Sequence, residues 1–114
     1  MSEPENINQD PVLEMANDII NTNDARRIYE FARDLLGAPI DKLADAVIKT
    51  NDAHYIYYFA RDIRNAPIDK LADGIVNTGD TKYTNAEYIY YFASIPNAPI
   101  DKLADAIVKA GNVK

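Results

Sequence analysis

The sequence predicts an all-α protein, a short right-handed α-solenoid of about seven antiparallel helices. The first observation is repetition, because segment 37–49, GAPIDKLADAVIK, returns with few changes at 65–77 and 97–109, and a fainter copy occupies 10–21. The second is a helical hydrophobic period inside every copy. The third is the close spacing of these segments, which leaves connections of two to four residues and makes consecutive helices reverse direction.

Each repeat unit of about 28 residues has two halves, called A and B. Both halves carry apolar residues at i, i+3, i+4 and i+7, which is one stripe of an α-helix. In the middle copy these residues are Ile56, Phe59, Ala60 and Ile63 in the A half and Ile68, Leu71, Ala72 and Ile75 in the B half. We expect A helices at 24–35, 52–64 and 85–95, and B helices at 11–21, 39–49, 67–77 and 99–109.

Residues that begin and end helices stand between the halves. Residue types suited to helix N-caps precede the A segments at Asn23, Asn51 and Thr84, where Thr84 and Glu87 predict a capping box. Residue types that tolerate the left-handed conformation follow the A segments at Gly37, Asn65 and Asn97. A proline then predicts the first residue of each later B helix, at Pro39, Pro67 and Pro99.

Two details within the B halves carry further predictions. Asp45 with Lys49, and Asp105 with Lys109, have the i, i+4 spacing of ion pairs on the outer face of a helix. Gly74 stands where the other B helices have alanine, which predicts a close contact between helices.

Length and composition indicate one ordinary domain. The chain has 114 residues, of which 47% are hydrophobic and 26% charged, enough for an independent core. The chain has no cysteine, which excludes a disulfide framework, a thiolate nucleophile and a thiolate metal site. Because no basic region precedes an apolar run and no apolar segment reaches about 18 residues, we expect a cytoplasmic protein without a membrane segment.

The net charge of −6 comes entirely from the first 24 residues. Residues 1–24 contain six acidic residues and no lysine or arginine, whereas residues 25–114 contain twelve of each sign. We expect residues 1–9 to form a flexible acidic tail and residues 10–114 to form a single helical repeat domain. Clusters of one sign usually form solvated tails or faces.

The repeat resembles the broad HEAT-like class of helix-pair repeats over residues 10–111. The units YIYYFARD and NAPIDKLADAI are also similar to tandem repeats found in uncharacterised bacterial and viral proteins. The period is shorter than those of the usual HEAT, tetratricopeptide or ankyrin repeats. This resemblance implies a surface for binding other macromolecules.

The sequence contains no convergent set of groups for catalysis. His54 is the single histidine, and its repeat counterparts are Arg26 and Glu87, on the side of the A helix opposite the apolar stripe. A lone histidine does not make the usual imidazole-rich metal site, so we expect an exposed surface residue. We expect no enzymatic activity and no cofactor.

Tyrosine is concentrated in the A halves and the inserted segment 79–83. Tyr58 and its counterpart Tyr91 are predicted to point away from the apolar stripe. Aromatic residues of this kind are enriched in binding sites, and the alternative is that both are ordinary surface residues. The remaining tyrosines of the A halves are expected to flank the stripe with their hydroxyls in water; these are Tyr29, Tyr55, Tyr57, Tyr88 and Tyr90. The candidate partner-binding residues are Tyr58, Tyr91, Glu30, Arg26, Arg33, Arg61, His54 and Glu87.

The leading hypothesis is a non-enzymatic module, a scaffold or regulator, that binds a protein partner through this Tyr/Arg surface. A competing hypothesis is a small acidic inhibitor, of the kind encoded by phages, that blocks the nucleic-acid site of its target. Direct nucleic-acid binding is not expected, because the chain lacks a basic footprint.

The C-terminal B helix predicts self-association. Solenoids usually end in a repeat with a polar outer side, yet this helix keeps the internal apolar pattern. The residues available for contact with another chain are Ile100, Leu103, Ile107 and Val108.

Overall fold

The computed structural model describes the backbone of residues 10–78 and 83–111, and the side chains of 10–78 and 87–109. Its helices are α2 (Pro11–Asn21), α3 (Ala25–Asp34), α4 (Ile40–Lys49), α5 (Ala53–Asp62), α6 (Ile68–Val76), α7 (Tyr83–Phe92) and α8 (Ile100–Gly111). The described ranges thus hold seven helices and no strand, which confirms the all-α prediction. Within them, no helix combines the length and the apolar character needed to cross a membrane.

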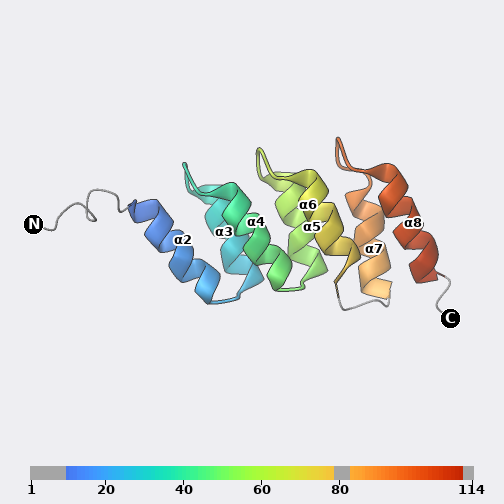
Figure 1. The fold of residues 1–114 in the computed structure, drawn as a ribbon, viewed down its shortest axis with the longest axis horizontal. Helices are drawn as coiled ribbons and strands as arrows, with labels where there is room; N and C mark the ends of the chain where they lie inside the picture. Colours follow the sequence, from blue (N-terminus) through green and yellow to red (C-terminus); the bar gives the residue numbers. More distant parts are fainter. Residues whose placement is uncertain (1–9, 79–82, 112–114) are drawn as a thin grey trace, which may run out of the picture.

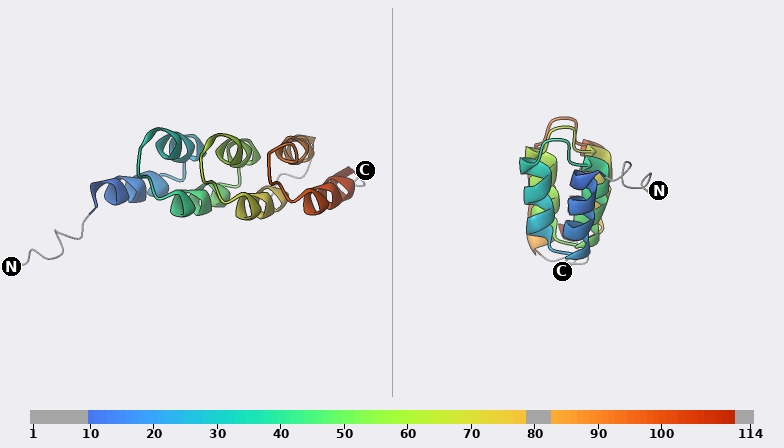
Figure 2. Two further views of the ribbon diagram at one scale, coloured as in Figure 1. Left: turned by 90° about the horizontal axis from the view of Figure 1, so that it is seen from above. Right: turned by 90° about the vertical axis from the view of Figure 1, so that its left-hand side faces the viewer.

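The helices lie in two layers. Figure 2 shows the B helices α2, α4, α6 and α8 in one row and the A helices α3, α5 and α7 in the other, and the order of the helices in Figure 1 shows that the two kinds alternate along the chain. Helix α5, for example, contacts α3 and α7 in its own layer and α4 and α6 in the facing layer. The apolar stripes meet between the layers, where Ile56, Phe59 and Leu71 are fully buried.

Helices α3 and α5 begin one residue later than predicted, because aspartate caps them. The side chains of Asp24 and Asp52 accept hydrogen bonds from the backbone N–H groups of Arg27 and Tyr55, at 3.2 and 3.4 Å. Asn23 and Asn51 are therefore not N-caps. Instead they take φ values of 55° and 64° directly after the preceding B helix, a conformation that asparagine tolerates better than most residues.

Helices α4, α6, α7 and α8 also begin at other residues than predicted. Pro39 and Pro67 are N-cap residues in extended conformation, with ψ of 90° and 91°, and α4 and α6 begin at the next residue. Helix α8 likewise begins at Ile100, so Pro99 is not its first residue, contrary to prediction. Helix α7 begins at Tyr83, so Thr84 lies inside the helix and cannot form the predicted capping box.

The left-handed residues after the A helices are confirmed, with φ of 84° at Gly37, 67° at Asn65 and 71° at Asn97. Each occupies the third position of a four-residue turn; the first is closed by the hydrogen bond from Ala38 N to Leu35 O, 3.2 Å. A positive φ at that position defines a type II turn. The A helices therefore end before Leu35 and Ile63, which were expected to be helical.

The third A segment is one residue shorter than the others, and its last turn tightens to compensate. Ser94 N donates to Tyr91 O and Ile95 N to Phe92 O, at 3.1 and 2.9 Å, both three residues back. In the middle repeat, Ile63 N reaches four residues back to Phe59. As a result Ile95 is 8% exposed, close to the 6% of Ile63.

Ion pairs link neighbouring B helices. Asp45 pairs with Lys70 of the next B helix at 3.0 Å, and Asp73 pairs with Lys102. The predicted Asp45 pair with Lys49 is therefore replaced by a contact between repeats, whereas Asp105 and Lys109 form the predicted pair at 3.4 Å. The sequence spacing allowed both partners, and only the stacking of the helices selects between them.

Candidate functional site

A continuous row of aromatic rings crosses the A layer. We call it the aromatic ribbon, and its members are Tyr29, His54, Tyr55, Tyr57, Tyr58, Tyr88, Tyr90 and Tyr91. Neighbouring rings have centroids 4.3 to 6.3 Å apart, and most pairs are tilted or edge-on. These are the geometries that aromatic pairs prefer. The ribbon therefore joins α3, α5 and α7 in one surface.

The ribbon arises because one contact repeats from helix to helix. Tyr29 on α3 packs against Tyr55 and Tyr58 of α5, with centroid distances of 5.8 and 6.1 Å. Tyr57 on α5 repeats the contact with two tyrosines of α7, at 5.9 and 5.8 Å. Tyr90 holds the same position on α7 and is 67% exposed, because no A helix follows α7 in the described chain. Accessibility of the rings thus increases towards α7.

Tyr29 is the buried end of the ribbon. Its side chain is 7% exposed, and its hydroxyl donates a hydrogen bond to Asp62 of the next A helix. Burial, and then the hydrogen bond to this carboxylate, raise the pKa of Tyr29. The prediction that the Tyr29 hydroxyl lies in water was wrong, because the helical period contains no information on contacts between repeats.

Two Arg–Asp pairs support the rings. Arg33 and Arg61 each bind the following aspartate through two hydrogen bonds, of 2.7 and 2.9 Å to Asp34 and of 2.6 and 2.8 Å to Asp62. The guanidinium of Arg33 lies 5.2 Å from the Tyr29 ring centroid, and that of Arg61 lies 5.3 and 4.8 Å from two rings of the ribbon. These hydrogen bonds lower the pKa of both aspartates. Both arginines are therefore held over tyrosine faces with their charge compensated.

His54 joins the ribbon from the first turn of α5. It is exposed, as predicted, but its ring centroid lies 4.3 Å from that of Tyr88, and its Nε2 lies within hydrogen-bonding distance of the Tyr88 hydroxyl. Desolvation raises the pKa of Tyr88. Glu87 accepts a 2.8 Å hydrogen bond from Tyr91, which raises the pKa of that tyrosine. His54, Glu87 and Tyr91 are thus all in contact with rings of the ribbon or belong to it.

The remaining predicted site residues divide between two surfaces. Tyr58 is half-buried among Tyr29, His54 and two other rings, so it does not stand alone on the outer face as predicted. Arg26 and Glu30 form a 3.0 Å ion pair on α3, which raises the pKa of Arg26. Glu30 also lines a groove between α2 and α3, so it belongs to a second surface.

Sequence reasoning did not identify the role of Asp62. The available signal was an Arg-Asp dipeptide at the end of two A helices, replaced by a single serine in the third. The helix dipole disfavours an acid at a helix C-terminus. An acid repeated at that position therefore indicates a partner, here an arginine on its own helix and a tyrosine on the preceding A helix.

The terminal helix α8 offers less apolar surface than predicted. Leu103 is fully buried inside the chain and Ile107 is half-buried, whereas Ile100 and Val108 are 53% and 59% exposed. Leu103 therefore cannot contact another chain in this fold. The predicted self-association would depend on Ile100 and Val108.

We expect Asp62→Ala to lower the free energy of unfolding by about 1–3 kcal/mol, since it leaves the buried Tyr29 hydroxyl without its charged acceptor. Asp34→Ala is the matched control, because Asp34 binds its arginine in the same way but is more exposed; we expect no measurable change. Chemical denaturation of the two variants measures both values. If Asp34→Ala and Asp62→Ala lower the free energy of unfolding equally, the hydrogen bond between Tyr29 and Asp62 does not stabilise the fold as proposed.

The Asp62 interaction also predicts a pH dependence. The folded pKa of Asp62 is lowered, so the stabilisation is present above the unfolded pKa of about 4 and is lost as the pH falls through the folded pKa. The unfolding free energy of the natural chain should therefore fall more steeply below pH 4 than that of Asp62→Ala.

No family model, curated protein sequence or solved structure matches the chain. We therefore infer function from the surface that the described residues form.

Proposed function

We propose that this protein is a non-enzymatic protein-binding module, a scaffold or regulator, that contacts its partner through the aromatic ribbon. The observation that carries the proposal is the continuity of eight rings across three helices, with two arginines placed over them. Tyrosine and arginine are enriched among the residues that contribute most to protein interfaces. The partner surface that fits has apolar groups for the rings and hydrogen-bonding groups for the hydroxyls.

We further propose that the fold is a short right-handed α-solenoid of antiparallel helical hairpins, of the HEAT-like kind. The 28-residue spacing of the first three B segments supports this, as does the alternation of helices between two layers (Figure 2). In such an array one contact recurs in every repeat, and extended binding surfaces form along one layer. The repeated ring contact from α3 to α5 and from α5 to α7 is a surface of that kind.

The ribbon is ordered before any partner binds. Each internal ring touches at least two others, and Arg33 and Arg61 are fixed by two hydrogen bonds each. Side chains that are already immobilised lose less conformational entropy on association. A pre-ordered aromatic surface therefore favours binding more than the same residues on mobile loops.

Charge favours a protein over a nucleic acid as the partner. The net charge is −6, and the arginines over the rings are neutralised by their neighbouring aspartates. Nucleic-acid binding needs uncompensated cations to displace counterions from phosphates. The acidic-inhibitor hypothesis has less support, because Asp10 and Asp24 accept hydrogen bonds as helix caps and so serve the fold.

The test compares the natural chain with the double variant Tyr58→Ala and Tyr91→Ala. Partners that co-purify from the native source are identified with the natural chain, and their affinities are then measured by titration calorimetry with both proteins. We expect the double variant to bind at least about tenfold more weakly, since truncation of a central aromatic residue has effects of this size or more. Circular dichroism verifies that the helices remain.

Leu36→Ala serves as the control, because Leu36 is 94% exposed and lies outside the ribbon. It removes an exposed apolar side chain from the loop after α3 without touching a ring. We expect unchanged affinity. If the double variant binds as tightly as the natural chain, the ribbon is not the binding surface, and a filter-binding assay at low salt tests the nucleic-acid alternative.

A further inference from the structure

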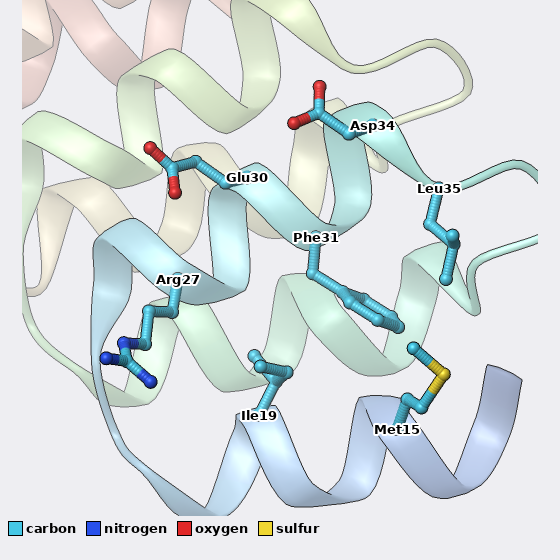
Figure 3. Close-up of a pocket in the computed structure, with 7 residues that line it drawn as sticks. All are labelled: Met15, Ile19, Arg27, Glu30, Phe31, Asp34 and Leu35. Carbon is cyan, nitrogen blue, oxygen red and sulfur yellow. The ribbon is translucent and has the colours of Figure 1, made fainter.

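A groove lies at the N-terminal end of the array, between α2 and α3 (Figure 3). Its apolar part is formed by Met15 and Ile19 of α2 together with Phe31 and Leu35, and its volume is about 490 Å³. Charged side chains from α3 line the rest of it, namely Arg27, Glu30 and Asp34. Met15 is 49% exposed and Phe31 half-exposed.

The repeat shows what fills such a groove. The residues 28 positions later that correspond to Met15, Ile19, Phe31 and Leu35 are Leu43, Val47, Phe59 and Ile63. All four are buried, at 0 to 6% exposure. They belong to α4, α5 and the residue after α5, and α3 contacts both of these helices. An A helix is therefore the natural occupant of this kind of groove, and none precedes α2 in the described chain.

We propose that the groove between α2 and α3 binds an amphipathic helix of a protein partner whose contact face resembles that of α3. The buried residues of α3 are Ala25, Ile28, Tyr29 and Ala32; Tyr29 packs against α5, and Arg33 lies over its ring. The expected partner motif is thus Ile-Tyr-x-x-Ala-Arg. This site is separate from the aromatic ribbon proposed above.

The charged residues of the groove fit a partner tyrosine and arginine. In the internal contact, the Tyr29 hydroxyl donates to Asp62. The pKa of Asp62 is lowered first by the hydrogen bond from Arg61, and the charge of Arg33 adds a smaller effect in the same direction.

Asp34, 28 residues before Asp62, holds the same repeat position and lines the groove. Arg27 corresponds in the repeat to Tyr55, one of the two tyrosines that pack against Tyr29. The guanidinium of Arg27 can contact the ring face of a partner tyrosine in the same place.

A helix with basic residues fits better than a second copy of this chain. Helix α2 carries Glu14 and Asp18 and has no basic residue, so the end of the array that holds the groove attracts cations. Each described A helix already lies against its own B helices: α3 against α4, α5 against α6 and α7 against α8. A second folded copy therefore has no unoccupied A helix to donate.

The probe for this site is a peptide with the sequence of residues 23–36, NDARRIYEFARDLL, cross-linked on its outward face because a helix this short is marginal alone. A fluorescent label reports its binding to the full chain by anisotropy. We expect saturable binding with a dissociation constant below about 1 mM. Replacing the peptide tyrosine by alanine should weaken binding at least tenfold, since a buried aromatic anchor is lost.

Met15→Lys in the full chain should also weaken binding at least tenfold, because it places a cation in the groove without altering a buried side chain. Leu36→Lys is the matched control, since its site is 94% exposed and outside the groove; it should leave binding unchanged. The ribbon variant Tyr58→Ala and Tyr91→Ala should also bind the peptide normally, so the two sites can fail independently.

Three outcomes would overturn the proposal. The first is no saturable binding up to about 1 mM peptide. The second is unchanged affinity in Met15→Lys. The third is a dimer in sedimentation that grows with concentration and is abolished by Met15→Lys, which would assign the groove to a second copy.

Discussion

Phe59→Ala should lower the free energy of unfolding by about 3–5 kcal/mol, the usual cost of removing a fully buried phenylalanine side chain. Phe59 is 0% exposed, on α5 in the middle of the array. Its removal leaves a cavity between helices that contact both neighbouring repeats. Chemical denaturation followed by circular dichroism measures the change.

The repeat supplies matched controls for this substitution. Phe31 and Phe92 hold the same repeat position on α3 and α7. Phe92 is also 0% exposed, so Phe92→Ala should cost about as much as Phe59→Ala. Phe31 is half-exposed in the groove next to α2, so Phe31→Ala should cost less than half as much, about 1–2 kcal/mol. Equal costs for Phe31 and Phe59 would contradict the difference between the end and the interior of the array.

Gly74→Ala should destabilise the protein by about 1–2 kcal/mol, although alanine is the better helix former by about 1 kcal/mol. A Cβ atom at residue 74 would lie 2.7 Å from Cγ1 and 3.0 Å from Cγ2 of Ile48 on α4. These atoms are bonded directly to Cβ of a stiff β-branched side chain and cannot swing away. Overpacking of this kind typically costs 1–3 kcal/mol.

Ile48→Ala provides the control, because it removes both contacting γ-carbons and Cδ1. In that background Gly74→Ala should become neutral or stabilising by up to about 1 kcal/mol, as expected from helix propensity alone. A double-mutant cycle measured by denaturation gives the coupling between the two residues. If Gly74→Ala destabilises equally in both backgrounds, the contact with Ile48 is not the reason for the glycine.

The hydrophobic period predicted the existence and type of every described helix. Ile56 and Phe59 of α5 and Leu71 of α6 lie in the predicted stripes and are fully buried. The stripe of α5 also contained Ile63, which is buried but lies in the turn after the helix. A side chain can complete a stripe from the first residue after a helix, so periodicity alone places helix ends imprecisely.

Helix caps were assigned less well, because neighbouring residues competed for the same role. Asn51 and Asp52 are both good N-cap residues. The loop after α4 contains one residue with positive φ, and Asn51 takes this conformation while Asp52 caps α5. The position of each residue in the loop decided between them, and propensity did not.

The candidate site was predicted in part. The tyrosines of the A helices were identified by their repetition in the sequence, and the structure joins eight aromatic rings in one ribbon. The burial of Tyr29 and its hydrogen bond to Asp62 link residues 33 positions apart. The helical period concerns residues three and four apart and gives no information on such a pair.

The sequence by itself determined the helices, their order and the residues that face the core, because these depend on the 3.6-residue period and on turn residues that act locally. The tertiary structure decided which repeats touch through which side chains: the continuity of the aromatic ribbon, the pairing of Asp45 with Lys70 and the groove next to α2. The physical reason is that these contacts join different repeats. Their geometry is set by how the helices stack, and no local sequence pattern specifies it.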